Sequence, residues 1–215
     1  MNPIFRPQKR NVDTFIREQV FDDLLFVKGK NLRDAYNFAE KKFNILNFDV
    51  NNLADANLIN STMTKIFNMT EGKAKYPPIV SLRRKKKSRY RGFCGDISIE
   101  LIKNKKIASV LIHEIGHYNH QACSKNYYKM GKLSELENDG ITDLSIYNQF
   151  MNDKASLKLI KKYICPYATS SPAEFIACTF EKIINGKKLP AEIYNLYCKY
   201  EGPFVDIFMK KGLIQ

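Results

Sequence analysis

The motif HEIGH at residues 113–117 constrains this chain more than any other feature of its sequence. Two histidines four residues apart lie on the same face of a helix, so both imidazoles can bind one metal ion. The residues just before the motif, 107–112, are mostly apolar, which is typical of a helix that is buried on one side. We therefore predict a buried helix that presents His113 and His117 to zinc.

Glu114 follows the first histidine, and its carboxylate would lie beside the metal rather than bind it. There it can take a proton from a zinc-bound water and pass it on, as a general base does in a zinc hydrolase. All three histidines of the chain lie between residues 113 and 120. The motif also arises by chance, and the alternative is an ordinary amphipathic helix with two surface histidines.

A catalytic zinc site needs a third protein ligand and an open fourth position. His120 lies only three residues after His117 and would not converge easily on the same ion. The longer histidine motif of the metzincins is missing from the chain. We therefore expect a glutamate from a later helix, and two compete: Glu174 and Glu135.

Glu174 stands in the first turn of an expected helix. Ser170 or Ser171 can cap this helix, and Pro172 suits its first turn. Ala177, three residues after the glutamate, leaves that face shallow enough for a second helix to approach. Glu174 can thus reach a ligand position on a helix that packs against the motif.

Glu135 belongs to the sequence ELEND at residues 135–139, which is similar to the E-x-x-A-D segment of membrane-type and related gluzincins. Asn138 replaces the alanine of that pattern, and the residues that follow do not continue it. The segment can also be a solvated acidic helix face, or Glu137 or Asp139 can accept the free N–H of a ligand histidine. On these local signals, Glu174 and Glu135 both stay candidates for the third ligand.

The sequence AEFIACTF at residues 173–180 resembles the second signature of the anthrax lethal factor-like peptidases, a gluzincin group with the pattern A-E-F-F-A-x-x-F. The resemblance covers roughly residues 108–182. It departs at Ile176 and at Cys178-Thr179, which are packing positions rather than ligand positions. Only the catalytic domain of lethal factor is comparable in size with this chain.

The resemblance implies roles for five residues. It implies a zincin-like metallopeptidase with one catalytic zinc ion, in which Glu114 is the general base. Tyr167, seven residues before Glu174, stands where the family has a tyrosine that supports the tetrahedral intermediate. The implied zinc ligands are His113, His117 and Glu174, and with this resemblance we favour Glu174 over Glu135 as the third ligand.

Apolar spacing predicts helices on both sides of a short β-prone region. Helix-like spacing runs from Asn11 to about Asn68, where Val20, Leu24 and Leu25 fit one stripe. Residues 79–82 and 96–101 read as two strands, which we expect to form a hairpin or loop pair around a basic run. Later helices are expected at residues 105–121, 132–151, 156–163, 171–185, 190–200 and from 204.

These elements predict an α+β fold: a mainly helical zincin-like metallopeptidase domain with a small β-sheet before the active-site helix. We expect a single domain over residues 1–215, with a helical part at 1–75 and the sheet, active-site helix and C-terminal helices at 76–215. In zincins an edge strand ahead of the active-site helix binds extended substrate. The strand at 96–101 can be that edge strand, or it can be a buried strand with no exposed edge.

The charge of the chain is strongly basic, with a formal net charge of +13. Seven lysines and arginines lie between Arg83 and Arg91. This run can contact an anionic partner, either nucleic acid or an acidic protein, or it can be a solvated hairpin tip. No helix-turn-helix, zinc-finger or RNA-recognition motif accompanies it, so base reading is not expected.

The cysteines and the N-terminus bear on the compartment. The five cysteines are widely spaced, without a C-x-x-C pair, and we expect them to be reduced and mostly buried. No apolar run approaches the length of a membrane helix, and no signal-peptide core is present. We expect a soluble cytoplasmic protein, with leaderless export left open.

Together these features predict a zinc-dependent metallopeptidase that hydrolyses peptide bonds of a protein substrate. One alternative is a nucleic acid-associated protease that resembles the Spartan type, since such proteases combine HExxH with basic surfaces. The other alternative is a non-catalytic regulatory or binding module whose zinc site is structural. The intact Glu114 argues against the second alternative, because a structural site has no use for a base.

Overall fold

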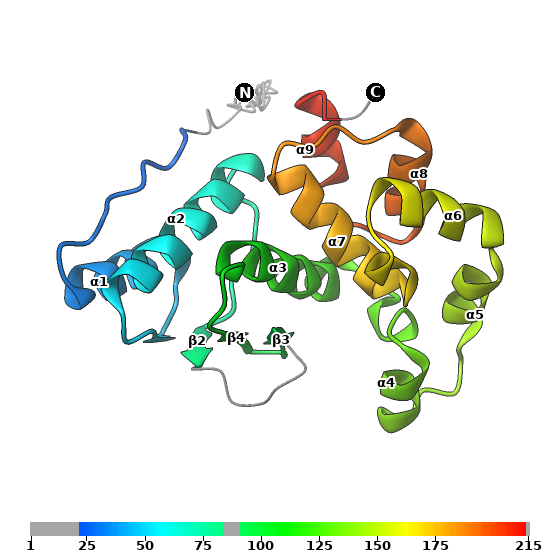
Figure 1. Cartoon of the computed structure of the whole chain (residues 1–215), viewed down its shortest axis with the longest axis horizontal. Helices are drawn as coiled ribbons and strands as arrows, with labels where there is room; N and C mark the ends of the chain where they lie inside the picture. The colour runs from blue at the N-terminus through cyan, green and yellow to red at the C-terminus, as the bar shows by residue number, and fades with distance from the viewer. Residues whose placement is uncertain (1–21, 84–90, 214–215) are drawn as a thin grey trace, which may run out of the picture.

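The computed structural model describes residues 22–83 and 91–213, and these form an α+β fold that is mainly helical (Figure 1). The small sheet predicted before the helix with the HEIGH motif is confirmed, and it has four strands. The elements are α1 (Leu32–Phe43), β1 (Asn47–Asp49), α2 (Leu53–Met69), β2 (Ile79–Arg83), β3 (Gly92–Cys94), β4 (Ser98–Ile102), α3 (Ile107–Cys123), η1 (Tyr127–Lys129), α4 (Leu133–Asn138), α5 (Ser145–Asn152), α6 (Lys154–Tyr163), η2 (Tyr167–Thr169), α7 (Pro172–Ile184), α8 (Ala191–Lys199) and α9 (Val205–Lys210).

The sheet has the strand order β1-β2-β4-β3. Strands β1, β2 and β4 are parallel, and β3 pairs antiparallel with β4. The predicted strands at 79–82 and 96–101 are confirmed, but the expected hairpin between them is wrong. They pair in parallel, with the fully buried Val80 beside the fully buried Ile99, and the intervening chain adds β3 at the edge. The short strands β1 and β3 were not predicted.

The prediction that Val20, Leu24 and Leu25 form one side of a helix is also wrong for the residues that the structure describes. Leu24 and Leu25 lie in a segment without helical structure, and Val20 lies outside the described residues. The backbone of Leu24 exchanges two hydrogen bonds with the side-chain amide of Asn68 on α2, at 2.8 and 3.0 Å. Asn57 binds the backbone of Gly29 in the same way. Contacts with α2 therefore replace the internal hydrogen bonds of a helix.

The expected helix at 132–151 is interrupted and forms α4 and α5. Gly140 adopts the left-handed conformation, with φ of +71°, and this ends α4. The Asp143 side chain then accepts a hydrogen bond from the backbone N–H of Ser145, at the start of α5. The other helices predicted after the sheet agree with the structure within a few residues.

Helix α3 lies between the sheet and α7 (Figure 1). Gly116 allows α3 and α7 to approach closely, because a Cβ atom at this position would lie 3.2 Å from the Cα of Ala177 and 3.1 Å from the ring of Phe180. This agrees with the shallow face predicted at Ala177. The two helices therefore pack closely at the HEIGH motif itself.

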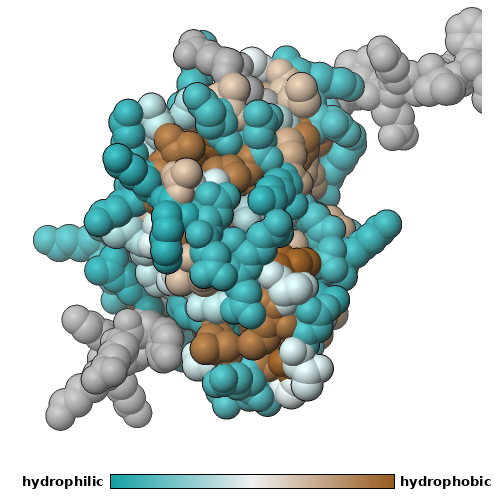
Figure 2. All heavy atoms as spheres, turned by 90° about the vertical axis from the view of Figure 1, so that its right-hand side faces the viewer, coloured by the Kyte–Doolittle hydropathy of each residue, from teal (hydrophilic) through white to brown (hydrophobic). Residues whose placement is uncertain are grey.

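Most of the buried hydrophobic residues form one connected cluster around α3 and α7, which includes Met63, Ile99, Leu111, Phe175 and Phe180. Figure 2 shows the molecule from the right-hand side of Figure 1. Most of this face is hydrophilic, and smaller apolar areas lie between the hydrophilic residues. Within the described ranges, no helix has the length and apolar character needed to cross a membrane. The organisation of residues 1–215 as a single domain stays a prediction.

Candidate metal centre

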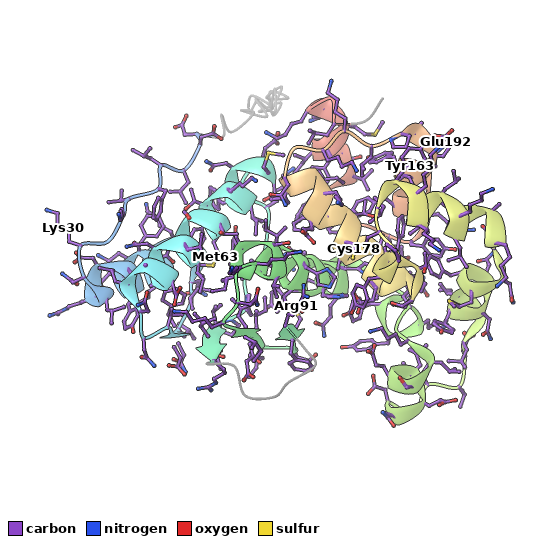
Figure 3. The ribbon with its side chains drawn as sticks, in the orientation of Figure 1. Lys30, Met63, Arg91, Tyr163, Cys178 and Glu192 are labelled. Atoms are coloured by element: carbon purple, nitrogen blue, oxygen red, sulfur yellow. The ribbon has the colours of Figure 1, made fainter. Side chains whose placement is uncertain are left out.

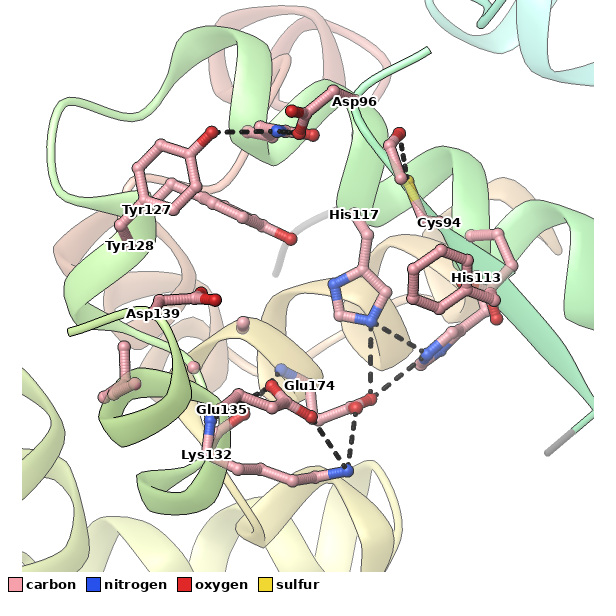
Figure 4. A pocket seen from close by; sticks show the side chains of 18 of the residues that line it. Cys94, Asp96, His113, His117, Tyr127, Tyr128, Lys132, Glu135, Asp139 and Glu174 are labelled. Atoms are coloured by element: carbon pink, nitrogen blue, oxygen red, sulfur yellow. Dashed lines mark hydrogen bonds and ion pairs between the residues drawn. The ribbon is translucent and has the colours of Figure 1, made fainter. Parts of the chain in front are cut away.

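The two motif histidines face the same pocket from α3 (Figure 4). His113 and His117 are one helical turn apart, and their Nε2 atoms are 3.1 Å from each other. Both side chains are largely buried, with 14% and 12% of their surface exposed. The four-residue spacing of the two histidines thus brings their Nε2 atoms close together.

Glu174 reaches this point from the first turn of α7. Ser171 caps the helix, since its hydroxyl accepts a hydrogen bond from the Glu174 N–H at 3.1 Å, and Pro172 is the first helical residue. The Oε2 atom of Glu174 lies 3.1 Å from Nε2 of His113 and 3.5 Å from Nε2 of His117. The structure therefore places Glu174 with both histidines.

The three atoms have the spacing of metal ligands. Their mutual distances are 3.1, 3.1 and 3.5 Å. In a tetrahedral zinc site with bonds of about 2.0–2.1 Å, two ligand atoms are about 3.3–3.4 Å apart. In the described part of the chain, this is the one group of three or more His, Cys, Asp or Glu side chains that could hold a metal ion. The donor set of two imidazoles and one carboxylate fits zinc.

The three side chains are electrostatically coupled. Burial alone would raise the pKa of Glu174, but its contacts with His113 and His117 hold that pKa well below its ordinary value. Burial disfavours the charged form of His113, yet the hydrogen bond and charge of Glu174 outweigh it and raise the His113 pKa. A metal ion at this site would therefore compete with a proton for His113.

The second oxygen of Glu174 is held by two other side chains. The Tyr167 hydroxyl donates a hydrogen bond to Glu174 Oε1 at 2.6 Å, and Lys132 Nζ lies 3.3 Å from the same oxygen. Lys132 is also 3.3 Å from the Tyr167 hydroxyl. Sequence reasoning placed Tyr167 near the site but missed Lys132, which has no motif around it.

Glu135, the competing ligand, lies on the rim of the pocket instead. Its carboxylate is 3.9 Å from Lys132 Nζ, and 60% of its side chain is exposed. It does not join the group of three ligand atoms. The structure thus brings Glu174, and not Glu135, to the two histidines (Figure 4).

The edge strand β3 lies against the carboxylate of Glu114. A Cβ atom at Gly92 would be only 2.6 Å from Glu114 Oε1, so the glycine makes room for this side chain. Burial raises the pKa of Glu114. The strand predicted at 96–101 is β4, which lies inside the sheet between β2 and β3. Of the two alternatives for the strand at 96–101, the structure therefore shows the strand with no exposed edge, and β3 forms the edge of the sheet.

The pocket has a volume of about 470 Å³. One wall is β3 with Phe93, and the opposite wall comes from the chain between η1 and α4. Tyr127, Tyr128 and Asp139 line it as well (Figure 4). It is large enough for several amino-acid side chains.

Neither outer nitrogen of the two histidines has the acidic partner that the sequence suggested. His113 Nδ1 lies 3.7 Å from the sulfur of Cys178, and His117 Nδ1 has no hydrogen-bond partner among the described residues. The suggestion that Glu137 or Asp139 accepts a hydrogen bond from a ligand histidine is therefore wrong. The sequence signal for Cys178 was only its place one turn after Glu174.

His120 points away from the site, as predicted. Its Nε2 is 3.0 Å from the carbonyl oxygen of Tyr200, and the side chain is fully buried. Burial and the nearby His117 lower the pKa of His120 to about 4. His120 therefore stays neutral inside the protein and has a structural role.

Two other expectations concern the surface. Arg84 to Tyr90 of the basic run lie outside the described residues, while Arg83 pairs with Asp49 at 2.9 Å and with Glu100 at 3.5 Å. The cysteines are less buried than expected, because Cys178 alone among the five is buried.

Comparisons with protein-family models, with curated proteins and with solved structures found no match to this chain. The site itself therefore carries the argument about function.

Proposed function

We propose that this chain is a zinc-dependent metallopeptidase of the lethal factor-like gluzincin type. The observation that carries the proposal is the triangle of His113, His117 and Glu174 ligand atoms beside the buried Glu114. A structural zinc site is closed by four protein ligands, whereas this group offers three and faces a pocket. The arrangement supports a catalytic site with an open position.

The proposed metal is one zinc ion held by His113, His117 and Glu174. When bound, zinc would polarise the scissile carbonyl and lower the pKa of a water molecule. The negative charge of Glu174 and the largely buried surroundings favour a divalent cation at this point.

Glu114 is the proposed general base. Its carboxylate lines the same pocket as the two histidines, and burial raises its pKa toward the neutral range, where a base works best. It would accept a proton from the attacking water and give it to the departing amine.

Tyr167 is proposed to donate a hydrogen bond to the oxyanion. Burial and the neighbouring Glu174 raise the pKa of Tyr167, so its hydroxyl stays a donor at any physiological pH. In the structure this hydroxyl is bound to Glu174, within the pocket that would hold substrate. Donating to the oxyanion would need the hydroxyl to leave that contact.

The proposed substrate is an extended peptide. Strand β3 is at the end of the sheet, and its outer edge borders the pocket. A peptide that adds to this edge would pass Gly92 and Glu114 on its way to the metal. The exposed ring of Phe93 would contact it.

A Glu114→Gln substitution tests the mechanism. It keeps the size of the side chain but removes the base, so we expect cleavage of a mixed peptide library to fall at least 100-fold. Zinc content should stay equal to that of the wild type, because Glu114 is no ligand. Glu135→Gln is the matched control, since it changes another carboxylate of the pocket and should leave cleavage unchanged.

Full activity of the Glu114→Gln protein would refute the mechanism. A zinc-loaded wild type that cleaves no member of the library would instead favour the non-catalytic binding module. Cleavage that begins only when DNA is added, and that weakens with salt, would favour the Spartan-like protease.

A further inference from the structure

Two cysteines meet beside the candidate metal centre. Cys165 lies between α6 and η2, and Cys178 lies on α7 one turn after Glu174. Their sulfur atoms are 3.8 Å apart. A disulfide has an S–S distance of about 2.05 Å, so the two atoms need to approach by about 1.8 Å to form one.

The sulfur of Cys178 has a second contact, with a proposed zinc ligand. It lies 3.7 Å from Nδ1 of His113, whose other nitrogen faces Glu174. Figure 3 shows Cys178 on α7 where this helix passes α3. Residues that contact the outer nitrogen of a ligand histidine fix its orientation and affect metal affinity. Movement of this sulfur toward Cys165 would therefore remove a support of the ligand.

The two thiols differ in access and reactivity. Cys178 is buried, whereas Cys165 is partly exposed. The hydrogen bond with Cys178 lowers the pKa of Cys165 to about 6. By contrast, burial raises the pKa of Cys94, Cys123 and Cys198. Cys165 is thus the more accessible and more reactive thiol of the pair, with Cys178 in place to complete a disulfide.

We propose that Cys165 and Cys178 form a reversible disulfide, with a small-molecule disulfide such as oxidised glutathione as the oxidant, and that this bond weakens metal binding at His113. The Cys165 thiolate attacks one sulfur of the oxidant and releases one thiolate. The Cys178 thiol then attacks the Cys165 sulfur of the mixed disulfide and loses its proton to the second departing thiolate. The protein loses two electrons and the oxidant gains two. The effect on the metal depends on the metal centre proposed above.

The test uses the full chain with Cys123→Ser and Cys198→Ser, which removes the two exposed thiols. Metal-free protein is incubated with oxidised glutathione, and the linked peptides are mapped by mass spectrometry. Zinc affinity is then measured against a competing chelator before and after oxidation. We expect a Cys165–Cys178 link that dithiothreitol reverses, and a loss of zinc affinity of about tenfold or more.

Cys165→Ser in the same background is the matched control. It keeps the Cys178 sulfur beside His113 but cannot form the disulfide, so oxidised glutathione should leave its zinc affinity unchanged. An equal loss in this control would overturn the proposal.

Two further outcomes would also overturn it: no Cys165–Cys178 link in excess oxidant, or a link that leaves zinc affinity unchanged. If the reduced protein binds no zinc, both this proposal and the proposed function fail. If it binds zinc but forms no link, this proposal alone fails.

Discussion

The buried His120 should make the stability of this protein depend on pH in a defined window. Its Nε2–H donates to the carbonyl of Tyr200, while its buried Nδ1 has no hydrogen-bond partner in the part of the chain that the structure describes. Protonation would place a charged N–H at Nδ1 with nothing to accept its hydrogen bond. This is why burial, with the nearby His117, lowers the pKa of His120 to about 4.

The magnitude follows from the two pKa values. The pKa of His120 is about 4 in the folded protein, and a histidine in an unfolded chain has a pKa of about 6.5. The unfolded chain therefore binds a proton more readily, and stability is lost as pH falls from about 6.5 toward about 4. Between pH 7.5 and pH 4.5 this linkage amounts to roughly 2–3 kcal/mol.

The assay compares the wild type with His120→Gln, both metal-free. Glutamine has an amide N–H that can bind the Tyr200 carbonyl but has no proton to gain in this range. Urea unfolding at pH 7.5 and 4.5 gives the free energy of unfolding of each protein. Other groups titrate in both proteins, so the wild type should lose roughly 2–3 kcal/mol more than the variant between the two pH values. Equal losses would refute the assignment of His120 as a neutral buried histidine.

Two other substitutions test the packing and charge around the site. Gly116→Ala should lower the free energy of unfolding by about 1 kcal/mol, because the crowding against Ala177 outweighs the gain in helix propensity. The control is Gly131→Ala, whose Cβ atom would lie at an ordinary 3.4 Å from its nearest neighbours, so the same urea titration should show no such loss. Lys132→Met should raise zinc affinity several-fold, because Lys132 competes for the charge of Glu174. The same substitution should destabilise the metal-free protein by about 1 kcal/mol. A fall in zinc affinity together with this loss of stability would contradict the interpretation.

Much of the candidate site could be predicted because its signals are local. The spacing of His113 and His117 fixes their common helix face, and a capping serine with a following proline places Glu174 in a first turn. Such signals depend on a few neighbouring residues and on regular helical geometry. The choice of Glu174 over Glu135 could not be made from these signals alone, because it depends on how α7 packs on α3.

The missed features all depend on contacts between distant parts of the chain. Strand β3 has only three residues and no alternating pattern, so nothing in the sequence shows that Gly92 lies against Glu114. The contact of Cys178 with His113 joins residues 65 positions apart. The prediction of an N-terminal helical stripe failed for the same reason, since Asn68 binds the backbone of Leu24 in a segment without helical structure. Tertiary hydrogen bonds overrode the apolar spacing there.

The zinc content of purified protein tests the central claim most directly. It should be measured by elemental analysis in the wild type, in Glu174→Ala and in Glu135→Ala, after equal exposure to zinc. We predict about one zinc ion per chain in the wild type and in Glu135→Ala, and strong loss in Glu174→Ala, because only Glu174 lies with both histidines. Zinc retained by Glu174→Ala, or lost only from Glu135→Ala, would contradict the metal centre described here.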